Sequence, residues 1–369
     1  MRRSEERSRR LRVVVCGTTF GQFYLAALAA LRSEFELVGI LSRGSAQSAA
    51  SAERAGVALF TDPAQLRGRA DVACVVVRSG VSGGAGSDLA RELLALGIHV
   101  LQEQPVHHDD VAGCVQAARR HGVVYLLGDL YVHLPPVRRF VAAARGLLAR
   151  RPARHLTAEC AIQVAFPLVH ILGDALGTMR PWRLTAAPEP VGPSRVLTGH
   201  LGETPLTAIV HHEIDPDDPD NHLPLLQRIS ISTDAGRLCL TDTHGPVTWA
   251  PRLHIPDPVK TAFDFDDAAS SFLSEPGLVQ LAPSSPSYRE VLTRWWPEAI
   301  GADLLRLRDR IFADRGSPAS EQYHLTLCRL WQEVTTELGY PALRPDQAHW
   351  PLPASELISA AAAASADPR

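Results

Sequence analysis

A glycine-rich segment near the start of the chain has the composition of a nucleotide-binding loop. Gly17-Thr18-Thr19-Phe20-Gly21 follows an apolar run and precedes a stretch with helical spacing. A strand, a glycine turn and a helix in this order bring backbone N–H groups at the helix N-terminus to the pyrophosphate of a dinucleotide. The fingerprint is imperfect, because Thr19 stands at the usual second glycine and Gly21 comes one residue early. We expect a dinucleotide site here, the alternative being a tight turn that binds no ligand.

The residues after the second apolar run indicate which dinucleotide binds. NAD sites place an acidic residue there, about 20 residues beyond the first glycine, to bind the ribose hydroxyls. This chain has no acid in residues 41–48. It offers instead the guanidinium of Arg43 and the hydroxyls of three serines, Ser42, Ser45 and Ser48. Because these groups suit a 2′-phosphate, we predict NADP(H) as the cofactor, against the alternative that Arg43 is a solvated loop residue.

Two other motifs suggest different chemistry. Gly80-Val81-Ser82-Gly83-Gly84 matches the nucleophile elbow of serine hydrolases. No His-Gly-Gly oxyanion loop precedes it and the stretch is rich in glycine, so we do not expect a hydrolase. His211-His212-Glu213 and the aspartates that follow could suggest a metal, but Pro216 and Pro219 disrupt the register of a calcium loop. A solvated acidic loop is the better explanation, and we expect no metal site.

Two further features limit the choice of catalytic residues. His170 and Asp174 are four residues apart on one face of a predicted helix, either as a core pair, which we favour, or as part of a substrate site. The only lysine, Lys260, lies in a proline-rich stretch that is typical of a surface loop. A mechanism that requires a catalytic lysine is therefore not expected.

The elements that position the glycine loop alternate between apolar runs and amphipathic segments. We predict strands over residues 12–16, 36–41, 57–60, 71–77, 99–102 and 123–127, and helices over 22–32, 48–55, 88–96 and 109–121. Repeated strand–helix alternation gives right-handed crossovers and a parallel sheet. The fold class is therefore α/β, with a doubly wound Rossmann domain over residues 12–130 after a disordered basic tail at 1–11.

The second half of the chain has a different pattern. Segments with period-two alternation follow one another from residue 195 to 249, after predicted helices near 135–149 and 168–176. Two further helices are predicted over 288–312 and 321–338. Residues 131–357 therefore read as an α+β domain with a mostly antiparallel sheet, one face of which is covered by helices, and 358–369 as a frayed tail.

Composition excludes several classes of function. The 369 residues include 37 basic and 40 acidic side chains, so the net charge of −3 creates no field that would attract nucleic acid or anionic lipid. No apolar run reaches the roughly 18 residues of a membrane span. The six cysteines are scattered and several lie in apolar patterns, which favours free thiols in a reducing cytoplasm over disulfides.

Several motifs together resemble a known family. Glu103-Gln104-Pro105 stands where Gfo/Idh/MocA-type dehydrogenases usually read Glu-Lys-Pro, with Gln104 in place of the catalytic lysine. The sequence is more specifically similar to the thiazolinyl imine reductases of siderophore assembly lines. That likeness rests on residues 17–24, 44–48, 76–79, 83–86 and 102–110, within a region of about 12–133. The resemblance implies that Arg78, Ser79, Glu103 and Gln104 join the cofactor site.

The same resemblance implies an activity and partners. It predicts NADPH-dependent reduction of a thiazoline C=N bond to a thiazolidine, on an intermediate tethered as a thioester to a carrier domain of a nonribosomal peptide synthetase. It also implies a cytoplasmic homodimer that pairs through the sheet of the second domain. Two alternatives stay open: a related oxidoreductase that acts on a free small molecule, and a non-catalytic NADP-binding regulatory protein.

Reduction of an imine needs an acid as well as a hydride. Since Gln104 does not titrate and Lys260 is remote, we expect the acid in Asp129-Leu130-Tyr131-Val132-His133, which crosses the carboxyl ends of the strands. Alternation would place Tyr131 and His133 on one side. Tyr131 matches the tyrosine proposed as the general acid in the family, with His133 as the rival donor and a packing role for Tyr131 as the alternative.

Overall fold

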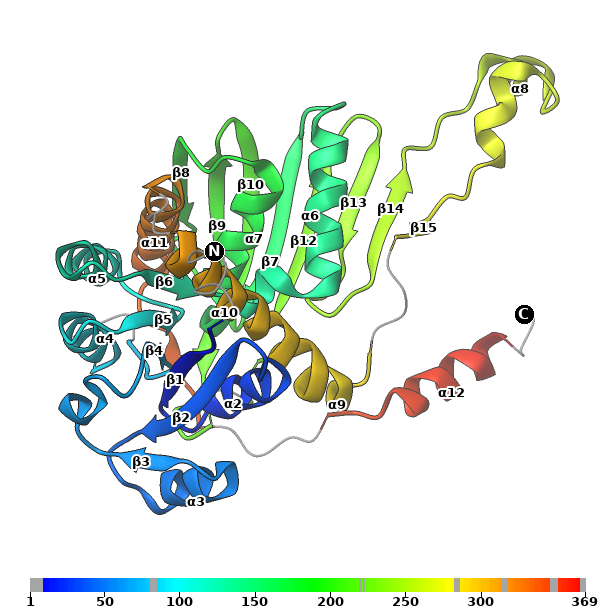
Figure 1. Ribbon diagram of the computed structural model, residues 1–369. Coiled ribbons are helices and arrows are strands. Elements are labelled where there is room, and N and C mark those ends of the chain that lie inside the picture. Colours follow the sequence, from blue (N-terminus) through cyan, green and yellow to red (C-terminus); the bar gives the residue numbers. More distant parts are fainter. Residues whose placement is uncertain are drawn as a thin grey trace.

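The computed structural model shows two sheets with helices packed on them (Figure 1). It describes residues 9–79, 85–218, 221, 223–281, 286–313, 318–345 and 351–365. The basic segment 1–8, most of the predicted tail, lies outside these ranges. All six cysteines are free and five of them are buried. Among the described residues, no helix is both long and apolar enough to cross a membrane.

The first sheet is parallel throughout, as the alternating pattern predicts. Its strand order is β3-β2-β1-β4-β5-β6. The strands are β1 (Leu11–Cys16), β2 (Phe35–Leu41), β3 (Ala58–Phe60), β4 (Val72–Val75), β5 (His99–Glu103) and β6 (Tyr125–Gly128), and the helices between them are α2 (Gly21–Ala30), α3 (Ala46–Ala55), α4 (Ala85–Ala95) and α5 (His108–His121). The strand order reverses between β1 and β4, and in such sheets a ligand binds beyond the carboxyl ends of the strands at that point.

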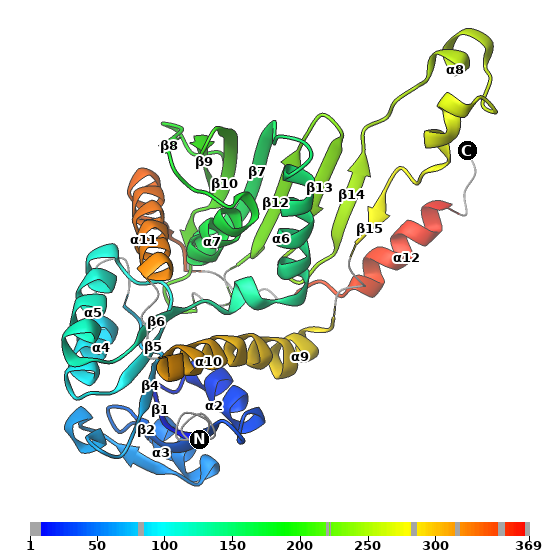
Figure 2. The same cartoon turned by 45° about the horizontal axis from the view of Figure 1, so that its top comes forward.

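The second sheet is mostly antiparallel, in the order β15-β14-β13-β12-β7-β10-β9-β8. Its strands are β7 (His155–Ala161), β8 (Trp182–Ala186), β9 (Ser194–Leu201), β10 (Thr204–His211), β12 (Gln227–Ser232), β13 (Gly236–Leu240), β14 (Val247–Pro251) and β15 (Val279–Gln280). The pair β7–β10 is parallel. A separate short pair joins β11 (Glu213–Ile214) to β16 (Ala342–Leu343). The helices α6 (Pro135–Leu148), α7 (Ala165–Leu176) and α11 (Pro318–Leu338) cover one face of the large sheet (Figures 1 and 2).

One long helix returns from the second half of the chain to the first sheet. The helix α9 (Tyr288–Glu290) continues through a π-helical turn at Val291–Trp295 into α10 (Trp296–Ala313). Helix α10 packs against α2, β5 and β6, and in Figure 2 it lies between the two sheets. The residues that it buries include Ile300, Leu304 and Leu307. The predicted boundary at residue 130 therefore does not divide the packing, because α10 completes the dinucleotide domain.

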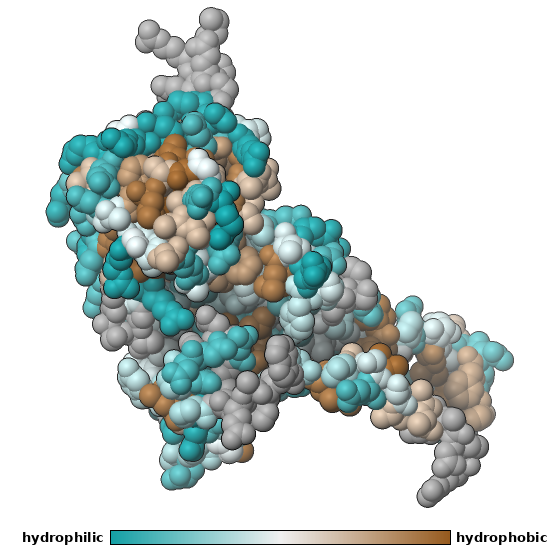
Figure 3. Space-filling model, turned by 90° about the horizontal axis from the view of Figure 1, so that it is seen from below, coloured by the Kyte–Doolittle hydropathy of each residue, from teal (hydrophilic) through white to brown (hydrophobic). Residues whose placement is uncertain are grey.

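Two segments project from the body of the protein. Residues 252–278, between β14 and β15, form an arm with the helices α8 (Asp257–Ala262) and η4 (Ala268–Ser274) (Figure 2). Lys260 is therefore on a short surface helix rather than in a loop. The predicted frayed end instead contains a helix, α12 (Ala354–Ser365), with residues 366–369 outside the described ranges. Seen from below, the projecting end at the right in Figure 3 shows apolar surface, and Leu357 and Ile358 of α12 are both exposed.

Candidate functional site

The glycine loop has the backbone geometry that a close ligand requires. Gly17 has φ = +95°, and a Cβ there would lie 2.6 Å from the carbonyl oxygen of Val76. Helix α2 begins at Gly21 with no side-chain cap and no acid in its first turn. Thr18 is buried, Thr19 is exposed. A helix N-terminus of this kind at the carboxyl edge of β1 fits the pyrophosphate of a dinucleotide.

The loop after β2 divides the predicted phosphate-binding residues into two kinds. The Arg43 side chain is exposed. Ser45 caps α3, and its hydroxyl accepts the N–H of Ser48 at 3.2 Å. Ser48 is fully buried and its hydroxyl donates to the Ser45 carbonyl at 2.8 Å. Ser42 accepts the N–H of Gly44 at 3.1 Å. Arg43 and Ser45 are thus both exposed to a ligand, while the buried Ser48 hydroxyl is used within the turn.

A buried amide fixes the edge of the site after β4. The side-chain Nε2 of Gln102 donates to Ser79 Oγ at 2.8 Å and to Ser87 Oγ at 3.3 Å. Its Oε1 accepts the hydroxyl of Tyr125 at 2.8 Å. A Cβ on Gly86 would lie 2.4 Å from Ser79 Oγ, so this junction has no spare room.

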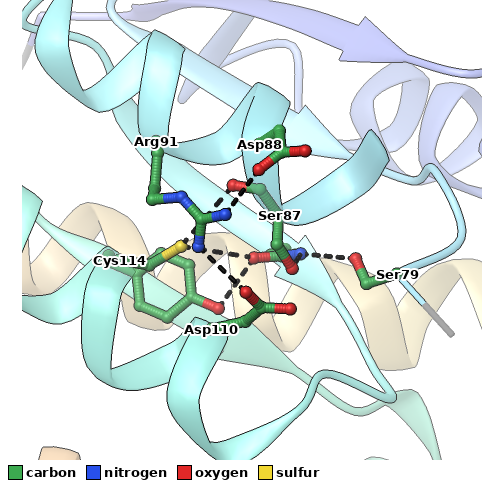
Figure 4. Close-up of polar contacts among 8 residues, drawn as sticks. Ser79, Ser87, Asp88, Arg91, Asp110 and Cys114 are labelled. Atoms are coloured by element: carbon green, nitrogen blue, oxygen red, sulfur yellow. Dashed lines mark hydrogen bonds and ion pairs between the residues drawn. The ribbon is translucent and has the colours of Figure 1, made fainter. Parts of the chain in front are cut away.

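The surroundings of this amide are drawn in Figure 4. Arg91 pairs there with Asp88 and with Asp110, which ties α4 to α5. Gln102 therefore anchors Ser79 and Ser87, the residues on either side of segment 80–84. That segment holds the hydrolase-like motif and lies outside the described residues. Arg78, the neighbour of Ser79, is exposed.

In the Glu-Gln-Pro motif at the end of β5, the Glu103 side chain is hydrogen-bonded within the protein, whereas the Gln104 side chain has an acceptor without a donor among the described residues. The hydroxyl of Tyr24 donates to the carboxylate of Glu103. Burial raises the pKa of Glu103 well above its usual range, and the nearby charges of Asp129 and Asp303 add to this effect. The backbone N–H of Gln104 donates to the Gly128 carbonyl at 3.2 Å. The Gln104 Oε1 atom is buried, and within the described ranges nothing donates a hydrogen bond to it. An acceptor left in this state at the strand edge fits a site that a cofactor completes.

The crossing segment is a turn of 3₁₀ helix rather than an extended strand. This turn, η2 (Leu130–His133), is capped by Asp129, whose carboxylate accepts the N–H of Tyr131 at 3.1 Å. The predicted alternation of Tyr131 and His133 is therefore wrong, since a side-chain cap has coiled the backbone. Tyr131 is nevertheless buried with its ring edge-on to Trp296, at a centroid distance of 6.3 Å.

Helix α10 supplies a carboxylate to the same turn. Asp303 Oδ2 accepts the N–H of Asp129 at 2.9 Å, and Asp303 Oδ1 lies 2.9 Å from His133 Nε2. Burial lowers the pKa of His133, but the hydrogen bond and charge of Asp303, with the charge of Asp129, raise it overall. His133 thus favours its charged form more than a free imidazole does.

His170 belongs to this cluster, with a partner that the sequence did not indicate. Its Nδ1 lies 2.8 Å from Asp129 Oδ2. Asp174, the partner favoured from the i, i+4 spacing, instead accepts the hydroxyl of Tyr323 at 2.8 Å. His170 is therefore a buried core histidine, but its carboxylate comes from the edge of the first sheet.

Sequence reasoning missed the contributions of Trp296 and Asp303. They are seven residues apart on α10, a spacing of two helical turns that places them on one face. The seven-residue spacing can be recognised in the sequence, but no local pattern indicates that this helix packs against β5 and β6.

The acidic region after His211 shows no metal-binding arrangement where the structure describes it. His212 is buried, and burial lowers its pKa. Asp215 Oδ1 accepts the N–H of Asp217 at 2.9 Å, as in a capped turn. Residues 219, 220 and 222 lie outside the described ranges. Within those ranges no three histidine, cysteine or acidic side chains are grouped as metal ligands.

Two family profiles match successive parts of the chain. Residues 11–129 match the Gfo/Idh/MocA profile, described as an oxidoreductase family with an NAD-binding Rossmann fold. Residues 151–250 match a profile described as thiazolinyl imine reductase Irp3-like, C-terminal. A search of curated proteins found no significant match.

Solved structures with the same fold include several sugar-related oxidoreductases. UDP-N-acetylglucosamine 3-dehydrogenase GnnA from Acidithiobacillus ferrooxidans is 14% identical with a TM-score of 0.62, over 89% of this chain and 98% of that one. A variant of a 3-ketoreductase from Actinomadura kijaniata, in complex with TDP-benzene and NADP, is 14% identical with a TM-score of 0.63, over 91% and 99%. Levoglucosan dehydrogenase, in complex with NADH and L-sorbose, is 10% identical with a TM-score of 0.66, over 89% and 96%. At such low identities the likeness shows the shared two-domain fold alone.

Proposed function

Because the chain belongs to the Gfo/Idh/MocA oxidoreductases and carries the C-terminal domain of the thiazolinyl imine reductases, we propose that it reduces a thiazoline C=N bond to a thiazolidine. It is an NAD(P)-dependent oxidoreductase. The observation that carries the finer proposal is the match of residues 151–250 to the imine reductase domain. The absence of a lysine at position 104, and the place of Lys260 on the projecting arm, support chemistry other than lysine-dependent alcohol oxidation.

NADPH is the cofactor that the loop after β2 favours. The segment 41–48 carries no acid to bind ribose hydroxyls, and α3 has no acid in its first turn. The exposed Arg43 guanidinium stands beside the N-terminus of α3, so both can attract a 2′-phosphate. Gly17 and the start of α2 would hold the pyrophosphate, and Gln104 Oε1 would accept a hydrogen bond from the bound group.

The residues of this chain supply the proton and the enclosure for the reaction. The cofactor, when bound, supplies the hydride that the imine carbon receives. Tyr131 donates its phenolic proton to the ring nitrogen, which gains basicity as the carbon is reduced. Trp296 packs on Tyr131 and on Phe20 of the glycine loop, so its indole helps to keep water from the space between them. His133 lies in the same turn as Tyr131, and the adjacent Asp303 raises the pKa of its imidazole.

We propose further that the substrate arrives as a thioester on a carrier domain. A tethered substrate has a high effective concentration, so only weak docking between the proteins is needed. The carrier-bound form should then react with a higher kcat/KM than a free thioester of the same ring.

The exposed surfaces support a homodimer. One face of the large sheet lies opposite α6, α7 and α11, and no helix from the described part of the chain covers it (Figure 1). The arm exposes apolar side chains that pack on little of their own chain, namely Leu253, Ile255, Phe263, Phe265, Phe272 and Leu278. Such a surface is typical of a protein interface. We propose that two copies pair with this face and arm buried, which sedimentation at several concentrations would test.

Mass spectrometry of a thiazolinyl-loaded carrier domain tests the activity directly. Incubation with the protein and NADPH should add two hydrogens to the tethered ring. Reduction of the free compound at an equal rate would contradict the carrier requirement. Tight NADPH binding with no reduction of carrier-bound or free thiazolines would contradict imine reduction and favour a regulatory role.

A further inference from the structure

We propose that Asp303 is a positioning residue that fixes the turn carrying Tyr131 and holds the His133 imidazole in place. The inference rests on the proposed function only for its link to proton donation by Tyr131. Its geometry is independent of the substrate. Both carboxylate oxygens of Asp303 are used, one by the Asp129 N–H and one by His133 Nε2, each at 2.9 Å.

Burial shows that Asp303 acts through its neighbours. Its side chain is 4% exposed, whereas that of His133 is 22% exposed. A buried carboxylate is costly unless a cation or hydrogen-bond donors compensate it. His133 Nε2 contacts this carboxylate, so Asp303 and the protonated form of the imidazole stabilise each other. The carboxylate is therefore enclosed by the protein, while part of the imidazole is accessible to solvent.

Helix α10 holds the turn at two points. Trp296 packs on the ring of Tyr131, and Asp303, two helical turns later, binds the backbone before the turn and the side chain at its end. One face of α10 thus contacts the residue before the turn and two side chains within it. A shift of the turn would move Tyr131 and His133 together.

The charges around His133 set the sign of the effect. From α10 it is faced by Asp303 and Arg306, and from the end of β6 by Asp129. The two carboxylates favour the imidazolium, and Arg306 opposes it. A positive charge in this turn lowers the cost of the phenolate that forms when Tyr131 gives up its proton. Tyr131 then regains a proton from water before the next turnover, so the protein returns to its starting state.

The variant Asp303→Asn removes the negative charge of the side chain but keeps its size and shape. The amide can still accept the Asp129 N–H and contact His133, but it no longer favours the imidazolium. In the full-length protein without substrate, an NMR titration should show the midpoint of His133 at least about one pH unit lower than in the wild type. An unchanged midpoint would overturn the proposal. Asp309→Asn, an exposed carboxylate on the same helix, is the matched control and should leave the titration unchanged.

Kinetics then distinguish positioning from a purely structural role. With carrier-bound substrate, Asp303→Asn should lower kcat about tenfold at pH values between the two His133 midpoints and leave KM and NADPH affinity near wild type. A shifted titration with an unchanged kcat–pH profile would overturn the positioning role. If the wild type reduces no thiazoline, the proposed function fails, while the titration still decides whether Asp303 holds His133.

A second variant protects the test against misfolding. His133→Gln keeps a polar side chain beside Asp303 but removes the titrating group. In the His133→Gln background, Asp303→Asn should cause no further loss of kcat, since both changes remove one charge pair. In the wild type, kcat should fall as pH rises and His133 loses its proton. If Asp303→Asn does not fold, His133→Gln alone should still abolish this fall. Persistence of that fall, or losses that simply multiply, would refute the pairing.

Discussion

The indole of Trp296 lies edge-on to the ring of Tyr131, with centroids 6.3 Å apart and planes inclined by 62°. The same indole lies 5.8 Å from the ring of Phe20 in the glycine loop and 5.0 Å from that of Phe23 in α2. One side chain at the start of α10 therefore joins the cofactor loop to the candidate acid. Tyr131 is thus a buried core residue that is linked to the glycine loop through Trp296.

We predict that Tyr131→Phe lowers kcat by about 10²–10⁴-fold, because the ring packing on Trp296 is kept while the proton donor is lost. NADPH affinity, measured by fluorescence titration, should stay near that of the wild type. Single-turnover reduction of the carrier-bound ring provides the rate. A loss below about threefold would transfer the role of the acid to His133 or to solvent.

Arg43→Ala should raise the Kd for NADPH at least about tenfold and leave that for NADH almost unchanged, because one or more charge-assisted hydrogen bonds are removed. Isothermal titration with both cofactors measures the two constants. Arg67→Ala, a change at another exposed arginine of the same domain, is the control and should affect neither. An equal loss for both cofactors would mean that Arg43 does not read the 2′-phosphate.

Gln104→Leu should have opposite effects on the free protein and on cofactor binding. It removes the buried Oε1 atom that has no donor among the described residues, so the melting temperature of the free protein should stay the same or rise. The Kd for NADPH should increase about threefold to tenfold, the value of one hydrogen bond.

The matched control is Gln102→Leu, whose amide is fully engaged with Ser79, Ser87 and Tyr125. That change should reduce the free energy of unfolding by at least about 2 kcal/mol. If Gln104→Leu destabilises the free protein as strongly as Gln102→Leu does, Gln104 is a packing residue and not an open acceptor.

Stability should depend on pH through Glu103. Burial raises the pKa of Glu103 well above its usual range, so the folded state holds the proton more tightly than the unfolded chain does. The resulting stabilisation is complete below the unfolded pKa of about 4.3 and is lost as pH rises through the folded pKa. Glu103→Gln resembles the protonated form. The melting temperature of this variant minus that of the wild type should therefore increase from pH 5 to pH 8.

Thermal melts across this pH range would measure the difference. Glu53→Gln, at an exposed glutamate of α3, should run parallel to the wild type. A constant offset between Glu103→Gln and the wild type would show that Glu103 keeps the same charge throughout.

The sequence predicted the first sheet closely, because most of its buried parallel strands contain a short apolar run rich in valine, leucine and isoleucine. It did not predict β8, a strand of only five residues in which Trp182–Ala186 buries no side chain fully and exposes Arg183 and Thr185 at the edge of the sheet. His170 was recognised as half of a pair, but local spacing favoured Asp174, whereas the true partner Asp129 is 41 residues away. The long-range contacts of Asp303 and Trp296 could not be read from any local pattern, since they depend on where α10 packs.

The return of α10 also determines when the cofactor domain can finish folding. A chain emerging from the ribosome usually folds its N-terminal domain first. Here the N–H of Asp129 can bind its acceptor, Asp303, only after a further 174 residues have been synthesised. Helix α2 likewise lacks its contact with α10 until residues 296–313 have been made. The second sheet must therefore be synthesised, and its chain brought back, before the first domain is closed. Such a high separation between contacting residues makes folding slow and ties both domains into one cooperative unit.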